Sequence, residues 1–270
     1  MMEFFVNGIG LCGPGLRGWQ QARNVFLEVD SYRQDDIPQP ALTLLPPNEL
    51  RRSSEVVKLS LQVAYEALQN NHVSTPDVTT VFATSGGESA ILHQLCLALA
   101  TPGRIISPTL FHHSVHNAAA GYWSIGMESH QPSVSLSCHD SSFGGGLVEA
   151  GTSIYANLSP VLLVAYDLPP PPPLYAARPL AAPFAAALLI GSQRLSVSLA
   201  HLSIQLVLGT GEETSMADSA LELVRNGNPA ARALPLLAAI AKHEKTQVVM
   251  NYLDDHQLLI DVTPCQSCQN

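Results

Sequence analysis

Apolar runs and amphipathic segments alternate along most of the chain. Short, nearly continuous apolar runs rich in β-branched residues are typical of strands buried on both faces of a sheet. Longer segments whose apolar positions lie three and four residues apart are typical of helices that pack on a sheet. The predicted strands cover residues 4–8, 78–83, 134–137, 160–166, 184–190, 195–208, 247–252 and 257–262. The predicted helices cover residues 46–68, 89–100, 114–125, 147–157, 216–225 and 229–241, and 104–107 is a strand or an extended turn.

This alternation predicts an α/β fold with a buried, mostly parallel sheet. Two proline-rich segments interrupt it, at 30–48 and 169–173. Both are predicted to be surface loops, because proline has no N–H to donate inside a helix or a central strand. The glycines at positions 8, 10, 13 and 15 predict a turn after the first strand. Their spacing is not the G-x-G-x-x-G of a dinucleotide-binding loop.

The chain of 270 residues is poor in charge, with 13% charged and 46% apolar residues. Soluble domains average about 25% charged residues, so we expect much of this surface to be hidden in a large core or against a partner. The formal net charge of -9 argues against nucleic acid and anionic membranes, because both attract basic proteins.

The chain shows no pattern for targeting or for crossing a membrane. Its N-terminus lacks the basic region of a signal peptide, and no window approaches the roughly 20 apolar residues of a membrane span. The five cysteines are scattered and odd in number, which indicates a reducing compartment without a disulfide framework. We therefore expect a cytoplasmic protein.

The segment from Gln131 to Gly146 carries the most chemical information. A buried strand there runs into the start of a helix, a junction where α/β enzymes often place a nucleophile because the helix N-terminus favours negative charge. In this chain Asp140 occupies the junction. We expect its carboxylate to cap the helix, and a catalytic acid or base is the alternative.

Three sequence motifs carry a resemblance to a known family. Residues 107–121 are similar to S-P-F-F…N-M-A-A-G, and Val6-Asn-Gly-Ile-Gly is similar to V-T-G-I-G. Pro132-Ser-Val-Ser-Leu-Ser-Cys-His-Asp-Ser-Ser aligns without a gap on P-S-x-x-I-S-T-A-C-x-S. These motifs belong to β-ketoacyl synthases, the thiolase-fold condensing enzymes of fatty acid and polyketide synthesis. The resemblance covers roughly residues 1–195 and is strongest from about 105 to 155.

The resemblance implies that the reactive groups of the family have been replaced. The family's cysteine nucleophile falls on Asp140, and Cys138 lies two residues too early. Leu208-Gly-Thr-Gly-Glu followed by Asp218 is similar to H-G-T-G-T…N-D, which places Leu208 at the first catalytic histidine. The G-H-x-x-G-A-A-G element that carries the second histidine is absent. We expect one thiolase-like layered α/β domain over 1–270, with a ketosynthase-like half over 1–195 and a reduced, truncated half over 196–270.

Chain-length factors are the members of this family that lack the nucleophile and pair with an active ketosynthase. The resemblance therefore implies a catalytically silent subunit of such a heterodimer, most similar to the short chain-length factors of aryl polyene biosynthesis. Its partner would hold the acyl chain received from acyl carrier protein, and no cofactor or metal is implied. In the family, the strand before the nucleophile pairs with its counterpart across the subunit boundary. The residues expected at that boundary are Phe111, His112, His113, His116, Asn117, Ser133, Val134, Ser135, Leu136, Ser137 and Gly145.

Two other functions stay open at this point. The chain could be a condensing enzyme or acyltransferase on its own, using Asp140, Cys138 or a serine. It could also be a free-standing acyl-binding or scaffolding protein without a ketosynthase partner. An acyl adduct on the isolated chain would favour the first, and a monomer indifferent to ketosynthases would favour the second.

Several smaller motifs have structural alternatives that we favour. A Cys138–His139 dyad requires the strand to end before these residues, because adjacent strand residues face opposite sides. His112 and His116 would share a helix face and suggest a metal, but an interface or core role is expected. Cys265 and Cys268 form one CxxC, which is weak evidence for zinc. Residues 85–89 lack the G-x-S-x-G spacing of a hydrolase elbow. The glycines 144–146 indicate close backbone approach, across a subunit boundary or at an internal crossing.

Overall fold

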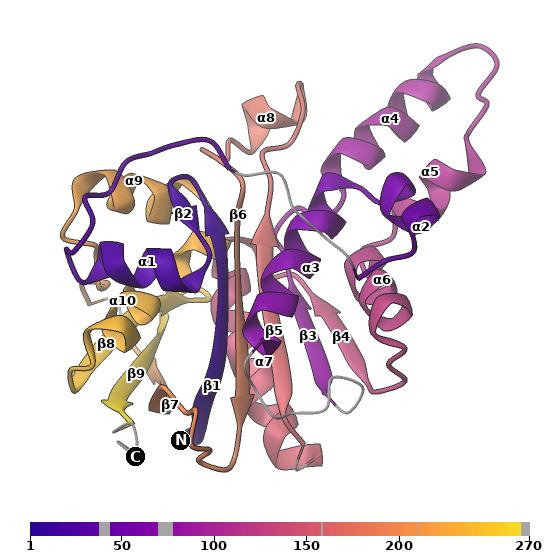
Figure 1. The fold of residues 1–270 in the computed structure, drawn as a ribbon. Coiled ribbons are helices and arrows are strands. Elements are labelled where there is room, and N and C mark those ends of the chain that lie inside the picture. The colour runs from indigo at the N-terminus through magenta and orange to yellow at the C-terminus, as the bar shows by residue number, and fades with distance from the viewer. Residues whose placement is uncertain (38–43, 70–77, 158, 210, 266–270) are drawn as a thin grey trace.

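A computed structural model describes residues 1–37, 44–69, 78–157, 159–209 and 211–265 (Figure 1). The strands are β1 (Met2–Gly13), β2 (Leu16–Arg17), β3 (Thr79–Ala83), β4 (Ser133–Leu136), β5 (Val161–Asp167), β6 (Phe184–Gly191), β7 (Ala200–Leu208), β8 (Thr246–Tyr252) and β9 (His256–Pro264). The α-helices are α1 (Trp19–Phe26), α2 (Pro47–Arg52), α3 (Glu55–Leu68), α4 (Ser89–Ala100), α5 (Pro108–His113), α6 (Ala118–Met127), α7 (Ser142–Asn157), α8 (Leu174–Ala177), α9 (Ser219–Gly227) and α10 (Leu234–Lys242). Two 3₁₀ turns, η2 (His139–Ser141) and η3 (Ala230–Ala233), precede α7 and α10.

The described strands form one sheet in the order β4-β3-β5-β6-β1-β7-β9-β8, with β2 paired to β1. Only the pairs β3–β4 and β3–β5 are parallel. The other pairs are antiparallel, so the α/β prediction is confirmed but the mostly parallel sheet is wrong. Parallel neighbours need a crossover of about a dozen residues or more, which helices supply around β3. The short link 253–255 between β8 and β9 permits only an antiparallel hairpin.

Both faces of the central strands are buried, and alternate residues enter two different cores. In β5, Val161, Leu163 and Ala165 face one core, whereas Leu162, Val164 and Tyr166 face the other. Helices α3 and α6 cover the second face, and α1, α7, α9 and α10 contribute to the first core. Burial on both faces explains why these strands are apolar at nearly every position.

Strand β1 is longer than predicted. The glycine-rich segment expected to turn after Gly8 continues as strand to Gly13. A side chain at Gly10 would place its Cβ 1.9 Å from the backbone oxygen of Val63 in α3. The glycine therefore permits close approach of helix to sheet, and the turn prediction is wrong because glycine also serves where backbones meet.

One predicted helix is divided, and another starts later than predicted. Instead of one helix over 46–68, α2 ends at Arg52 and α3 starts after Ser54, whose hydroxyl accepts a hydrogen bond from the Val57 N–H. The helix predicted over 114–125 begins only at Ala118 as α6, and α5, which was not predicted, ends before this range. Serine and asparagine side chains compete for backbone hydrogen bonds and favour helix ends, which explains both differences.

The other elements follow the predictions with shifted boundaries. Helix α4 and strands β3, β5 and β6 are confirmed, whereas 104–107 forms no strand and β7 starts only at Ala200. The predicted helix at 216–225 begins after Asp218, which caps it, and 229–241 starts with the 3₁₀ turn η3. The sheet continues from the N-terminal part into β7, β9 and β8 without interruption. None of the described helices is long and apolar enough to cross a membrane.

Figure 1 shows how two regions stand away from the sheet. Helices α4 and α5 project at the upper right as an arm beyond the edge formed by β4. The loop that contains α8 projects at the top, between the end of β5 and the start of β6. Both regions therefore lie at the end of the molecule where the strand-to-helix junctions of β3 and β4 are found.

Candidate functional site

The candidate site is the turn that links β4 to α7. Strand β4 ends at Leu136, η2 covers His139–Ser141, and α7 starts at Ser142, so Asp140 lies at the head of a largely buried helix as predicted. The Ser142 hydroxyl organises the turn: it accepts from the Cys138 N–H at 3.1 Å and donates to the His139 carbonyl at 2.7 Å. His139 has a positive φ of 52°, which tightens the chain here.

Asp140 does not cap the helix. Its Oδ1 accepts a charge-assisted hydrogen bond of 2.6 Å from the Arg178 guanidinium, which lies just after α8. The capping prediction is wrong because a nearby arginine competes better for a carboxylate than a backbone N–H does. Partial burial alone would raise the pKa of Asp140, but the hydrogen bond and positive charge of Arg178 bring that pKa below its usual value. The carboxylate is therefore ionised and bound.

The thiol near the turn is not activated. Cys138 is partly buried, and this burial raises the pKa of its thiol, so the thiol is protonated at neutral pH. The strand has ended before Cys138 and His139, so alternation does not separate them. The exposed His139 ring instead has its Nδ1 3.6 Å from Asp140 Oδ2. In the described residues no hydrogen bond joins this ring to the Cys138 sulfur. This geometry does not support a Cys–His dyad.

The glycines at 144–146 are explained by packing within the chain. A Cβ at Gly145 would lie 2.6 Å from the Cys138 sulfur. A Cβ at Gly146 would lie 2.7 Å from the Leu163 side chain of β5, and one at Gly144 would contact the β8–β9 hairpin. The internal helix crossing therefore accounts for the triplet without a partner, and the placement of Gly145 at a subunit boundary stays a prediction.

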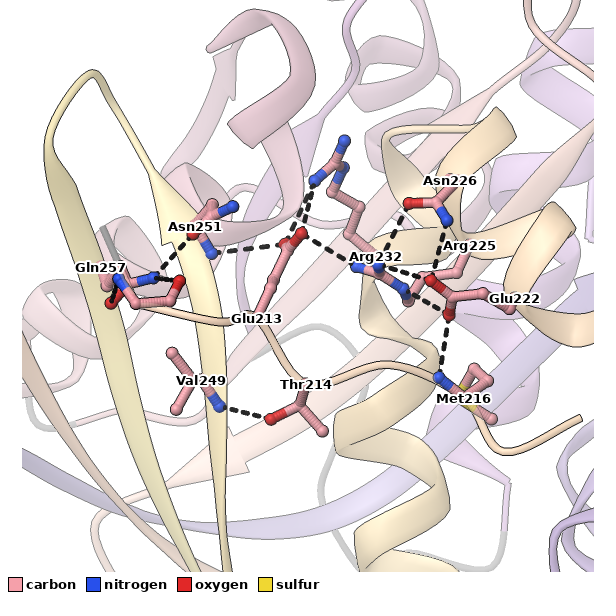
Figure 2. Close-up of polar contacts among 11 residues, drawn as sticks. Glu213, Thr214, Met216, Glu222, Arg225, Asn226, Arg232, Val249, Asn251 and Gln257 are labelled. Carbon is pink, nitrogen blue, oxygen red and sulfur yellow. Dashed lines mark hydrogen bonds and ion pairs between the residues drawn. The ribbon is translucent and has the colours of Figure 1, made fainter. Parts of the chain in front are cut away.

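The loop after β7 follows Leu208, the residue predicted at the position of the family's first catalytic histidine. Leu208 ends β7 with 74% of its side chain exposed, opposite His256 in the β7–β9 register. The side chain of Gln257 holds the loop at Gly211, accepting from its N–H at 3.2 Å and donating to its carbonyl at 2.7 Å (Figure 2). Thr214 exchanges two hydrogen bonds with Val249 of β8. The loop is thus fixed to the sheet.

A cluster of charges around the buried Arg225 fixes the same loop from the other side (Figure 2). Arg225 makes two hydrogen bonds of 2.8 and 2.7 Å to Glu222 and an ion pair of 3.2 Å to Glu213, while only 6% of its side chain is exposed. Arg232 contacts the other oxygen of Glu213 at 3.1 Å. The positive charge of Arg232 also contributes to the lowered pKa of Asp140, so the cluster and the turn are electrostatically linked.

This cluster was not predicted from the sequence. Glu222, Arg225 and Asn226 lie three and four residues apart on one helix, a spacing that could have indicated their mutual contacts. The partners Glu213 and Arg232 come from a loop and from η3, and no local pattern connects them. The cluster joins groups only through the tertiary fold.

The residues predicted at a subunit boundary lie in two neighbouring regions. Among the strands that the structure describes, β4 is at the edge of the sheet and pairs only with β3. Ser133 accepts a hydrogen bond from Thr80 at 2.7 Å, Val134 and Leu136 pack on the core, and Ser137 is exposed. The second region consists of α5 and the link to α6, where Phe111, His112, His116 and Asn117 are exposed and His113 is buried. Their role at a boundary stays a prediction.

The alternative motifs find structural explanations or no support. The end of α5 at His113 removes the helix face that His112 and His116 were predicted to share. No group of three potential metal ligands occurs among the residues that the structure describes. Ser85 donates its hydroxyl to buried Asp167, whose pKa is raised to about 6 by burial despite four hydrogen bonds, so Ser85 has a structural role. Of the CxxC motif, Cys265 is buried and Cys268 lies outside the described residues.

Comparisons with known proteins agree on one fold. The family model "Beta-ketoacyl synthase, N-terminal domain" matches residues 19–255. No curated protein matches the chain. A solved ketosynthase (ApeO) in complex with its chain length factor (ApeC) from Xenorhabdus doucetiae is similar, with a TM-score of 0.73 and 23% identity over 97% of this chain and 100% of that one.

Two further solved structures have the same fold at lower identity. The ishigamide ketosynthase/chain length factor has a TM-score of 0.73 and 12% identity, over 98% of this chain and 100% of that one. A type II polyketide synthase acyl-carrier protein in complex with its ketosynthase (AntDE:AntF) has a TM-score of 0.72 and 11% identity, over 98% and 99%. The predicted thiolase-like layered α/β fold is confirmed.

Proposed function

Because this chain belongs to the β-ketoacyl synthase family, we propose that it is a non-catalytic, chain-length-factor-like subunit. It pairs with an active β-ketoacyl synthase and shapes the channel that holds the growing acyl chain. The partner carries that chain covalently after receiving it from acyl carrier protein. The proposal gives this chain a role in shape and association instead of bond formation.

The ion pair between Asp140 and Arg178 is the single observation that carries the proposal. Decarboxylative condensation needs a thiolate to hold the acyl group. A carboxylate could form only an anhydride, which water would cleave, and this carboxylate is already bound by a guanidinium. An ionised, paired Asp140 explains why the turn keeps its shape after losing the sulfur that performs the reaction.

The position of the family's first catalytic histidine supports the same proposal. The Leu208 side chain cannot donate a hydrogen bond to an oxyanion. Loss of one such donor lowers the rate about 10²- to 10³-fold. The loop that follows it is fixed by Gln257 and by the Glu213–Arg225 cluster. These contacts preserve the loop as a structural element although its catalytic side chain is gone.

The free edge of the sheet supports a partner at β4. The carbonyls of Pro132 and Leu136 accept hydrogen bonds from the N–H groups of Thr80 in β3 and of Thr84 just after it. Because successive residues of a strand direct their backbone groups to opposite sides, Ser133 and Ser135 direct theirs to the unpaired edge. An unpaired edge is a template for a strand of another chain unless the protein protects it.

The arm beside this edge supports the same location. Helix α4 is apolar almost all round, yet only Ile91 and Leu95 are buried. Exposed apolar side chains gather on α4, α5 and the segments that follow them: Leu92, Leu97, Leu99, Ile105, Phe111, Val115 and Ile125. A helix that is apolar all round is normally buried, and a large exposed apolar patch normally marks an interaction site.

The proposal includes a subfamily and a compartment. We place the chain with the short chain-length factors of aryl polyene biosynthesis, acting in the cytoplasm. The Xenorhabdus complex of a ketosynthase and its chain length factor shares 23% identity with this chain, about twice the 12% of the ishigamide protein. Cys12, Cys96, Cys138 and Cys265 are free, as is usual in a reducing compartment.

Co-expression with a full-length β-ketoacyl synthase encoded next to this chain tests the proposal. We expect the two chains to co-purify and to elute as a one-to-one complex in size-exclusion chromatography. The isolated chain should bind a hydrophobic dye more strongly than the complex does, because its apolar arm is exposed without the partner. A soluble monomer that ignores the ketosynthase would contradict the proposal and favour a free-standing acyl-binding protein.

A further inference from the structure

The sheet ends in two edge strands, β4 and β8, among the strands that the structure describes. They differ in what lies against their outward backbone groups. On β4 these groups belong to Ser133 and Ser135, and no hydrogen bond reaches them within the described part of the chain. An open edge of this kind can pair with a strand of another chain. The same would hold for β8 unless something covered it.

The loop after β7 covers the β8 edge with two residues (Figure 2). Thr214 donates its N–H to the Val249 carbonyl at 2.9 Å, and its hydroxyl accepts from the Val249 N–H at 2.9 Å. Glu213 Oε1 accepts from the Asn251 N–H at 3.3 Å. These bonds use backbone groups that a neighbouring strand would need, so residues 213–214 occupy the place of a partner strand.

The charged cluster around Arg225 holds Glu213 in this position. The Glu213 carboxylate pairs with Arg225 at 3.2 Å and with Arg232 at 3.1 Å, and only 14% of its side chain is exposed. Removing such charges from water is costly, so a buried cluster is weak evidence for a role in stability alone. The contacts of this cluster direct one carboxylate oxygen against the edge of β8.

The covered part of the edge is shorter than β8. Because backbone groups alternate between the two sides of a strand, Gln247 directs its N–H and carbonyl outward, as Val249 does. No hydrogen bond reaches these two groups among the residues that the structure describes. A hollow of about 250 Å³ lies beside Gln247, which forms its wall together with Ser215, Thr246 and others. The exposed Lys245 just before β8 adds a charge, which is another usual protection of an edge strand.

We infer that Glu213 and Thr214 form a built-in cap that stops β8 from pairing with the β8 of a second copy of this chain. Two copies of one edge strand can pair antiparallel about a twofold axis, so a second copy is the partner most available to an uncovered edge. The cap blocks pairing at one edge strand and leaves β4 as the edge strand open to another chain. Only this last step rests on the proposed function, which places the ketosynthase at β4.

Self-association of the full-length chain tests the inference. The compared chains all carry Ser135→Pro, which blocks the β4 edge. Adding Thr214→Val removes the hydroxyl that accepts from Val249, so pairing of two copies no longer has to break that bond on either chain. We expect Thr214→Val to strengthen dimerisation about tenfold in analytical ultracentrifugation. Thr214→Ser is the matched control, because serine keeps both the hydroxyl and the N–H and should leave dimerisation unchanged.

Hydrogen exchange of the backbone amides identifies the strand that pairs. In the unchanged chain we expect slow exchange at Val249 and fast exchange at Gln247. In Thr214→Val, exchange at Gln247 should become slower as the chain concentration rises, because a second β8 then covers it.

Four results would overturn the inference. Thr214→Val could dimerise no more strongly than its Ser135→Pro parent, or Thr214→Ser could dimerise as strongly as Thr214→Val. Exchange at Gln247 in Thr214→Val could be equally fast at all concentrations. Val249 and Gln247 could exchange equally fast in the unchanged chain, a measurement that needs no variant.

The experiments use no ketosynthase, so their outcome is separate from that of the proposed function. A cap that behaves as expected while the ketosynthase fails to associate would contradict only the proposed function. Association of the ketosynthase together with unchanged dimerisation of Thr214→Val would contradict only this inference.

Discussion

Replacing Arg225 with methionine should lower the free energy of unfolding by about 3 kcal/mol. Methionine keeps much of the apolar stem but removes the two hydrogen bonds that Glu222 accepts from Arg225, and it leaves Glu213 with Arg232 as its cationic partner among the described residues. Removing one member of a buried ion pair leaves an uncompensated charge, which explains the size of the effect. Chemical denaturation followed by circular dichroism measures it.

Arg17→Met is the control, because Arg17 pairs with Asp35 at 3.6 Å with both side chains more than half exposed. We expect Arg17→Met to change the free energy of unfolding by no more than about 0.5 kcal/mol.

The pH dependence of stability gives a second check on the cluster. The hydrogen bond from Arg225 lowers the pKa of Glu222 from 4.5 to about 2, so the stability that the pair supplies is present above pH 4.5 and lost as the pH falls toward 2. This dependence of stability on acid pH should be smaller in Arg225→Met. If Arg225→Met lowered the free energy of unfolding by less than about 1 kcal/mol, a structural role for the cluster would be contradicted.

Replacing Ser135 with proline should weaken association with the ketosynthase roughly a hundredfold, or about 2.7 kcal/mol. The backbone N–H of Ser135 points to the free edge of β4, so proline removes a donor to the partner and places its ring against the incoming strand. The hydrogen bonds from Thr80 and Thr84 to the carbonyls of Pro132 and Leu136 do not involve Ser135, and they remain. Analytical ultracentrifugation of the mixed chains measures the affinity.

Ser135→Ala separates this backbone effect from the side chain. The Ser135 hydroxyl is buried without a hydrogen-bond partner in the described residues, so its removal should leave folding and association nearly unchanged. Circular dichroism should show the same fold for both variants. Undiminished association of a folded Ser135→Pro variant would mean that β4 is not the strand that meets the partner.

The sequence predicted those elements whose signals are local. Strands β5 and β6 are apolar on both faces, and α4 has helix-forming residues between clear boundaries. The break at Ser53–Ser54 and the late start of α6 at Ala118 depend on competition between side chains and backbone, which apolar periodicity does not report. The prediction of mostly parallel strands was wrong for a different reason. Whether two strands pair parallel or antiparallel is set by the connections between them and not by the residues inside a strand.

The candidate site divides in the same way. Asp140 lies at the head of α7, where the alignment of residues 132–142 placed it. Its partner Arg178 lies 38 residues away beyond a proline-rich loop, and no spacing rule links them. The capping prediction considered only the residues next to Asp140 in the sequence. The nearest donors there are backbone N–H groups, whereas the observed donor is the guanidinium of Arg178. Burial raises the pKa of Cys138, and no residue pattern along the chain reports that burial.

Intact mass spectrometry of the complex after incubation with an acyl-carrier-protein thioester tests the central claim most directly. Both chains are weighed separately, and the ketosynthase with its cysteine replaced by alanine provides the blank. Our account predicts an acyl adduct on the ketosynthase alone and an unmodified mass for this chain, with or without its partner. A stable adduct on this chain, mapped to Asp140, Cys138 or a serine, would contradict it.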